Sequence, residues 1–205
     1  MPKLVDHEQR REELAAAVWR LASRDGLDAV TIRGVSAEAG WSTGALHHYF
    51  SDKEELLLFA FKTVADRVGR RVATARKESG GPLELARALL AIGLPLDEER
   101  RDETRVWFAF LGLALTRLPL ARAQRLAYEQ WRRIVADALR DAQEQGEIDE
   151  DVDVEREAAA LVALVDGLAV QASFDPECLD VDLVDERLAE LRRAPARSRS
   201  RAPAR

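Results

Sequence analysis

Cysteine and histidine are scarce in this chain of 205 residues. Cys178 is the single cysteine, so an internal disulfide cannot form and a thiol cluster for a metal is not expected. A chain without disulfides suits a reducing compartment. The histidines are His7, His47 and His48, and adjacent helical residues point about 100° apart, so His47 and His48 do not converge on one ion. We therefore expect neither a metal nor another cofactor.

Signatures of catalysis and of membrane insertion are missing as well. There is no Gly-rich phosphate loop and no nucleophile beside an evident base, so we do not expect an enzyme. The longest apolar run, Val106 to Leu115, is shorter than the roughly 20 residues that cross a bilayer. Residues 1–14 lack the apolar core of a signal peptide. These features predict a cytoplasmic protein with no membrane partner.

Alternating strand patterns and internal repeats are also missing, whereas apolar residues recur at helical spacing along most of the chain. Glycine or proline interrupts this pattern at intervals, and the residues 97–104 are charged and are expected to form a loop or a short helix. The sequence therefore predicts an all-α fold. The expected helices cover about 7–24, 31–39, a short stretch after Ser42, 53–77, 83–94, a central buried helix at 105–118, 120–145, 154–174 and 183–192.

The stretch Thr31 to Phe50 carries the clearest local signal. Thr31 suits the N-cap of a first short helix, and Gly40 suits its end because glycine adopts the left-handed conformation. Ser42 or Thr43 suits the N-cap of a second helix. Two short helices joined by glycine are typical of a helix-turn-helix, but they also occur in helical proteins that do not bind DNA. The side chains expected outside are small or hydrogen-bonding, as contacts to phosphates and bases require; they are Thr43, Gly44, His47, His48 and Tyr49.

Residues 31–57 resemble the N-terminal domain of TetR-type transcriptional regulators. The residues that carry the resemblance are Thr31-Ile32-Arg33, Ala39-Gly40-Trp41-Ser42-Thr43-Gly44, Leu46, His48-Tyr49-Phe50, Asp52-Lys53 and Leu56-Leu57. The resemblance implies a three-helix helix-turn-helix DNA-binding domain at 1–52, a connecting helix at 53–78, and a helical-bundle domain for ligand binding and dimerisation at 79–192. It also implies a homodimer that represses transcription from a pseudo-palindromic operator and is released by a small-molecule effector. From their spacing alone, Ser51 and Glu54 form a capping box with Ser51 as the N-cap of the connecting helix.

The resemblance assigns DNA contacts to individual residues. Phosphate contacts are assigned to Thr31, Thr43, His47, His48, Tyr49 and Lys53, base contacts to Arg33, Thr43 and Gly44, and the cap beside them is Ser42. Two positions depart from the family pattern, which more often has tyrosine at position 47 and a polar residue at position 34. Nothing in the sequence explains Gly34, because a glycine within a helix costs about 1 kcal/mol relative to alanine.

Net charge is −6, although the DNA backbone attracts cations. The segment after Leu191 carries six arginines and no acid, so the rest of the chain is more acidic still. DNA affinity must then depend on a few local cations, on helix-terminal N–H groups and on this segment if it reaches the DNA. Pro, Ser and Arg without apolar residues cannot build a core, which favours a solvated, disordered tail at 193–205.

The last long helices carry more apolar surface than one bundle needs, and we expect them to pair with a second copy of the chain. The alternative is that they complete the core of a monomer. The residues expected at the dimer interface are Trp131, Val135, Leu161, Leu164, Val165, Leu168 and Ala172.

Aromatic and polar residues of the second domain are candidates for an effector pocket. They are Arg105, Trp107, Phe108, Phe110, Leu111, Leu115, Tyr128, Trp131, Asp166 and Gln171. An aromatic stripe at helical spacing is also what a plain core requires, but a polar group such as Asp166 within an apolar run needs a partner when buried. That partner is a bound molecule or an intersubunit hydrogen bond. Residues 106–180 resemble, more loosely, the betaine-synthesis repressor branch, which implies a choline-like cation held by aromatics and Asp166.

One alternative function stays open from the residues alone. The chain could be a dimeric helical interaction or small-molecule-binding module that does not bind DNA specifically.

Overall fold

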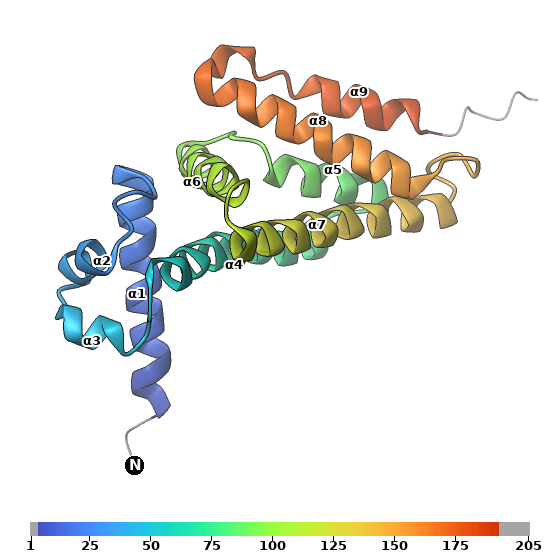
Figure 1. Ribbon diagram of the computed structural model, residues 1–205. Helices are drawn as coiled ribbons and strands as arrows, with labels where there is room; N and C mark the ends of the chain where they lie inside the picture. The colour runs from blue at the N-terminus through green and yellow to red at the C-terminus, as the bar shows by residue number, and fades with distance from the viewer. Residues whose placement is uncertain (1–3, 193–205) are drawn as a thin grey trace, which may run out of the picture.

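The computed structural model describes residues 4–192, and side chains from residue 9 (Figure 1). Those residues form helices and no strand, apart from one isolated antiparallel bridge between Ile148 and Arg192. The all-α prediction is confirmed; the Arg-rich segment 193–205 lies outside the described residues. The helices are α1 (Leu4–Asp25), α2 (Ile32–Ala39), α3 (Thr43–His47), α4 (Lys53–Glu78), α5 (Pro82–Ile92), α6 (Glu98–Ala114), α7 (Leu118–Glu144), α8 (Val154–Phe174), a 3-10 turn (Pro176–Cys178) and α9 (Asp182–Glu190).

Buried side chains form two clusters, and α4 contributes to both. The first, which we call the N-terminal core, joins α1–α4 to Val106 and Phe110 of α6 and to Leu120 of α7. The second, the C-terminal core, joins α5, α8, α9 and the later turns of α7 to Val72 of α4. Because α4 is one helix of 26 residues, it spans about 39 Å between the two. The expected boundary at residue 52 therefore does not coincide with the edge of a core.

The N-cap of α4 and the start of α6 differ from the prediction. The N-cap of α4 is Asp52, whose carboxylate accepts a hydrogen bond from the Glu55 N–H at 2.9 Å, and not Ser51. The Glu55 carboxylate in turn accepts from the backbone and hydroxyl of Ser51, so the capping box is displaced by one residue. Helix α6 begins at Glu98, because Asp97 caps it by accepting from the Arg100 N–H at 2.8 Å. The charged segment expected as a loop or a short helix is the first part of the longer helix α6.

The helix expected at 105–118 also ends earlier and is less buried than predicted. It ends at Ala114, and the next residue, Leu115, is 83% exposed. Helix α7 then starts at Leu118, before the expected position. The apolar residues around this tight turn cannot all face inward, which is why the run of hydrophobic letters overstated the burial.

Gly34 has a packing role that the sequence did not reveal. A Cβ built on this residue would lie 2.4 Å from the Ala29 carbonyl oxygen and 3.1 Å from Cδ2 of Leu21. Helix α2 therefore packs so closely against the loop after α1 that no Cβ atom fits at position 34. Only a residue without a side chain fits there.

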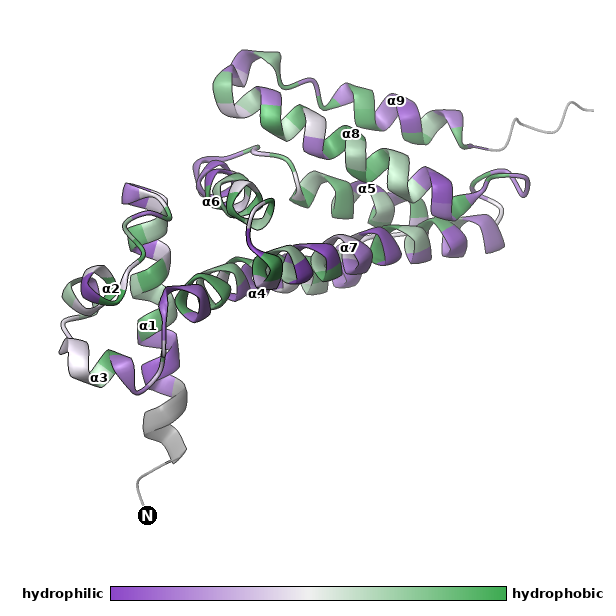
Figure 2. Cartoon of the chain, viewed as in Figure 1, coloured by the Kyte–Doolittle hydropathy of each residue, from purple (hydrophilic) through white to green (hydrophobic). Residues whose placement is uncertain are grey.

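Helix α8 is one of the more apolar helices of the C-terminal part (Figure 2). Its length, and a mean hydropathy of 1.4 over 18 of its residues, would also suit a membrane span. In this fold α8 packs against α7, and Leu161, Val162 and Val165 belong to the C-terminal core. Burial of that face accounts for part of the composition, and the apolar residues on the other face of α8 are half-buried or exposed.

Candidate nucleic-acid interface and effector site

Backbone geometry builds the turn between α2 and α3. The Thr31 hydroxyl accepts a hydrogen bond from the Gly34 N–H at 3.0 Å and so begins α2, which ends at Gly40 with φ at 70°. The Ser42 hydroxyl then accepts from the Ala45 N–H at 3.1 Å and begins α3. The predicted caps Thr31 and Ser42 and the predicted end at Gly40 are confirmed.

Helix α3 is held by its inner face and leaves its outer face in solvent. Leu46 is fully buried and Phe50 nearly so, both in the N-terminal core. Tyr49 is half-buried, with its ring 5.6 Å from the Trp41 ring, and Thr31 is half-buried as the cap of α2. The other predicted DNA-contact residues are exposed; they are Arg33, Ser42, Thr43, Gly44, His47, His48 and Lys53. Figure 1 places α3 at the edge of the molecule farthest from α8 and α9.

Some of the cations near α3 already form an ion pair with a carboxylate, and others do not. Arg20 and Arg24 both pair with Glu38, and the hydrogen bonds from Arg20 and then Arg24 lower the pKa of that carboxyl. Within the described side chains, neither Arg33 nor Lys53 lies within ion-pair distance of a carboxylate. These two cations are therefore available to a phosphate or a base edge.

Three of the predicted pocket residues come together, one from each of three helices. The rings of Trp107 on α6 and Tyr128 on α7 meet edge to face with centroids 6.0 Å apart, and the Tyr128 hydroxyl interacts with the Asp166 carboxylate on α8. We call Trp107, Tyr128 and Asp166 the aromatic–acid cluster. Phe61 of α4 stacks on Trp107 at 5.3 Å, so the cluster also touches the long helix.

Burial dominates the electrostatics of this cluster. It raises the pKa of the Asp166 carboxyl, and the hydrogen bond from Tyr128 offsets part of that rise. Burial, and next the bond to Asp166, raise the pKa of the Tyr128 hydroxyl. Within the described side chains no cation forms an ion pair with Asp166, while the Arg132 guanidinium lies 6.0 Å from the Tyr128 ring centroid. The site thus holds an acid without a counterion.

The remaining predicted pocket residues are not gathered there. Arg105 is exposed and pairs with Asp102, and Gln171 is exposed and donates to the Gly167 carbonyl at 3.3 Å. Leu115 points into solvent, whereas Phe110 is 1% exposed in the N-terminal core. Helical phase sends these four residues to different faces, and their assignment to an effector pocket stays a prediction. The half-buried members of the predicted set are Phe108, Leu111 and Trp131.

The predicted dimer residues lie mainly inside the protomer. Five of the seven are in its own cores and cannot present area to a second chain; they are Val135, Leu161, Val165, Leu168 and Ala172. Trp131 and Leu164 keep partial exposure. The sequence could not separate core from interface, because both are apolar. The opposite face of α8 is the exposed one, and its outermost apolar residue, Phe174, is 88% exposed.

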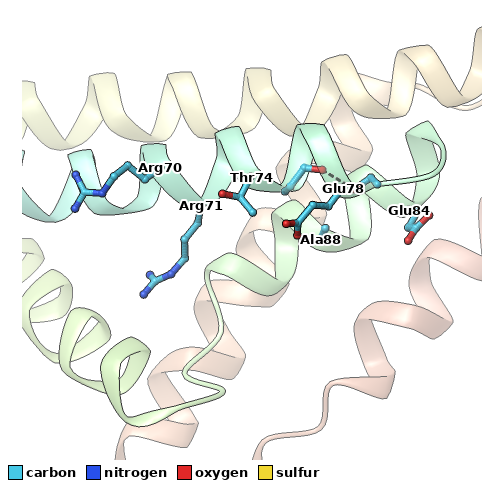
Figure 3. Close-up of a pocket in the computed structure, with 8 residues that line it drawn as sticks. Arg70, Arg71, Thr74, Glu78, Glu84 and Ala88 are labelled. Carbon is cyan, nitrogen blue, oxygen red and sulfur yellow. Dashed lines mark hydrogen bonds between the residues drawn. The ribbon is translucent and has the colours of Figure 1, made fainter.

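Two hollows lie away from the aromatic–acid cluster. One, of about 420 Å³, lies between α4 and α5 and is lined by residues that include Arg70, Arg71, Thr74, Glu78 and Glu84 (Figure 3). The other, of about 450 Å³, is lined by residues of α5, the residues before it, Glu147 and α9. Neither lining includes Trp107 or Tyr128.

An ionic network that sequence reasoning missed joins three helices. Arg67 of α4 lies 4.4 Å over the Trp19 ring of α1, and its Nε donates to Glu103 of α6 at 3.0 Å. Arg71 pairs with the same carboxylate and with Glu99. Glu103 is 5% exposed, so this is a largely buried acid with two guanidinium partners. No local signal could have found it, since the partners are 32 and 36 residues apart.

A capped helix-turn-helix, with unpaired cations beside its outer helix and an all-helical second part, defines a DNA-binding regulator. Two family models match the chain: "Bacterial regulatory proteins, tetR family" at residues 14–59 and "BetI-type transcriptional repressor, C-terminal" at 82–194. The chain belongs to the TetR family of transcriptional regulators.

Three relatives illustrate the similarity. The HTH-type transcriptional regulator PksA of Bacillus subtilis is 36% identical over 90% of this chain and 88% of its own. The HTH-type transcriptional regulator BetI of Rhizobium meliloti is 27% identical over 89% of this chain and 87% of its own. A crystal structure of a putative transcriptional regulator from Saccharomonospora viridis in complex with choline is 26% identical, with a TM-score of 0.77, and the match covers 89% of this chain and 95% of that one.

Proposed function

We propose that this chain is a homodimeric repressor that binds a pseudo-palindromic operator through α3 and leaves it when an organic cation binds its second domain. The observation that carries the DNA-binding half is the outer face of α3. It is exposed, it begins at a capped N-terminus, and Arg33 and Lys53 flank it without a carboxylate partner in the described side chains. A regulator of this kind acts on cytoplasmic DNA.

Roles follow from position on the two helices. Lys53 at the first turn of α4 would bind a phosphate, together with Thr31, His47, His48 and Tyr49 around α3. Thr43 and Gly44, at the start of α3, would lie closest to base edges. Arg33 on α2 is long enough to reach a base or a phosphate. At position 47, where the family more often has tyrosine, the imidazole of His47 would donate the hydrogen bond to a phosphate.

The proposed dimer surface is the exposed face of α8 with the adjoining part of α9. Ala159, Ala163, Val170 and Phe174 recur along that face at helical spacing, and Leu183 of α9 is 40% exposed. Small residues early in α8 allow close helix approach, while the larger ones supply apolar area. Helices α8 and α9 pack against each other at the outer side of the bundle (Figure 1). A two-fold axis there would present two α3 helices to half-sites about 34–36 Å apart.

The proposed effector site is the aromatic–acid cluster. An uncompensated, partly buried carboxylate beside two aromatic rings is the chemistry that binds ammonium groups. The similar S. viridis regulator holds choline, and the C-terminal half of this chain matches the BetI-type model. Contact between Trp107 and Phe61 would carry the change to α4, which reaches the DNA-binding end.

The decisive experiment is a gel shift with DNA from the flanks of the chain's own gene. A discrete complex that survives competitor DNA, and that weakens when choline is added, is expected. Coupling of about 1–3 kcal/mol would change operator affinity roughly 5- to 150-fold. Binding with no sequence preference would instead favour the alternative, a dimeric interaction or small-molecule-binding module.

A further inference from the structure

Helix α7 carries one buried polar side chain with no partner. Gln124 is 5% exposed, and neither its amide nitrogen nor its amide oxygen has a hydrogen-bond partner among the described residues. Buried side-chain amides are nearly always paired, because an unpaired one loses its bonds to water without replacement. A leucine of similar size would suit a plain core better. Gln124 therefore calls for a ligand or for another role in the free protein.

Helical register places Gln124 next to the aromatic–acid cluster. The inward stripe of α7 includes Leu120, Gln124, Tyr128, Trp131 and Val135, at successive steps of four, four, three and four. Residues four apart lie on the same helix face with Cβ atoms about 5–6 Å apart. Gln124 is thus one turn from Tyr128, on the side of the α6–α7 turn. By contrast, Gln130 on the same helix is exposed.

We propose that Gln124 is a specificity-determining residue of the effector site, which hydrogen-bonds an oxygen on the effector. The inference rests on the proposed effector site. It narrows the ligand class to an organic cation that also carries a hydroxyl or carbonyl group a few ångströms from its charged end. The cationic end lies against Trp107, Tyr128 and Asp166, and the oxygen lies toward Gln124. The amide can donate to a carbonyl, or both donate to and accept from a hydroxyl.

Two ligands that differ by a single oxygen test this. Choline and ethyltrimethylammonium share the quaternary ammonium, and only choline has the hydroxyl. We expect isothermal titration of the full chain to give roughly tenfold tighter binding of choline, because the deoxy analogue leaves a buried amide unpaired. In Gln124→Leu the preference falls to about twofold or less, and the melting temperature without ligand rises because the unpaired amide is gone. Gln124→Met, which is unbranched, is measured beside it in case leucine does not pack.

The matched control is Gln130→Leu, the same substitution at an exposed position of the same helix. It is expected to keep the wild-type preference for choline. An unchanged preference in both Gln124 variants, or equal affinity of the wild type for the two ligands, overturns the role of Gln124 while leaving the cation site intact. If neither ligand binds the wild type, the proposed effector class fails, and the role of Gln124 fails with it.

Discussion

Gly34 shows how one residue can depend on the backbone of a neighbouring segment. The Ala29 carbonyl occupies the place where a side chain would begin. Gly34→Ala is expected to lower the free energy of unfolding by about 1–3 kcal/mol, because α2 must move away from the loop. Thermal and chemical unfolding measure the loss.

Gly69 is the control for this substitution. It lies within α4, and a Cβ there would meet nothing within 4 Å. Gly69→Ala is therefore expected to stabilise the chain by roughly 0.5–1 kcal/mol. Equal effects of the two substitutions would mean that the close approach at Gly34 does not matter.

Lys53 is expected to contribute to DNA affinity without sequence preference. Lys53→Ala should weaken binding to all duplexes alike and reduce the slope of log affinity against log salt by about 1. Arg33→Ala should instead cost about 1–3 kcal/mol at particular base pairs. Lys77→Ala, at the far end of α4, is the control and should leave the slope unchanged. A slope that does not respond to Lys53→Ala would make that lysine a plain surface charge.

Asp166 makes stability depend on pH in a direction that can be worked out. Burial raises its pKa above the ordinary value of 3.8, so between the two values the folded chain holds more protons than the unfolded chain. Stability contributed by this carboxyl is therefore present at low pH and is lost as pH rises through that window. Asp166→Asn should flatten this part of the profile of unfolding free energy against pH.

Binding of a cation should show the opposite trend, because the cation requires the ionised acid. Choline affinity of the wild type is expected to increase with pH through the raised pKa of Asp166, and Asp166→Asn should weaken binding at every pH. Asp141→Asn, on the exposed face of α7, is the control for both measurements. Identical profiles for the wild type and Asp166→Asn would remove Asp166 from the site.

Among elements, α1, α4 and α6 are tied by the network around Glu103. A double-mutant cycle with Arg67→Met and Glu103→Gln is expected to give a coupling free energy of about 1–3 kcal/mol, because the carboxylate is buried. Arg140→Met, which removes exposed pairs with Asp137 and Glu155, is the control and should change stability much less. A coupling near zero at Arg67 would mean that the remaining partner, Arg71, compensates fully.

The bounds of a helix were predictable where capping residues in the sequence mark its ends. Thr31, Gly40 and Ser42 define α2 and α3 through local hydrogen bonds, and local signals are readable from sequence. The start of α6 was less clear, because its charged residues fit a loop as well as a short helix until Arg67 and Arg71 bury Glu103 from another helix.

The candidate sites also have a part that local sequence signals predict and a part that depends on how the helices pack. Exposure of His47 follows from the phase of the short helix α3, which Leu46 anchors, so it could be foreseen, as could that of Lys53 at the first turn of α4. The meeting of Trp107, Tyr128 and Asp166 depends on how α6, α7 and α8 cross, and the sequence alone could not show which of the predicted lining residues come together. Core and interface residues of α8 share one chemistry, and the fold alone separates them.

At the scale of the whole molecule, the exposed end of α8 tests the proposed dimer. Phe174→Glu places a charge where apolar area would meet its two-fold copy, so light scattering at micromolar concentration should report a larger monomer fraction. Operator affinity should fall with it. Leu126→Glu, at a residue of α7 that is 58% exposed, is the control. A monomeric wild type, or a Phe174→Glu chain that dimerises normally, would contradict the α8 surface.

The N-terminal core draws on Val106, Phe110 and Leu120, which come long after the helix-turn-helix in the chain. A hybrid sensor made by grafting the first 52 residues onto a different regulator would therefore lack half of the buried residues of this core. Such a swap needs the matching positions of α6 and α7 to travel with it.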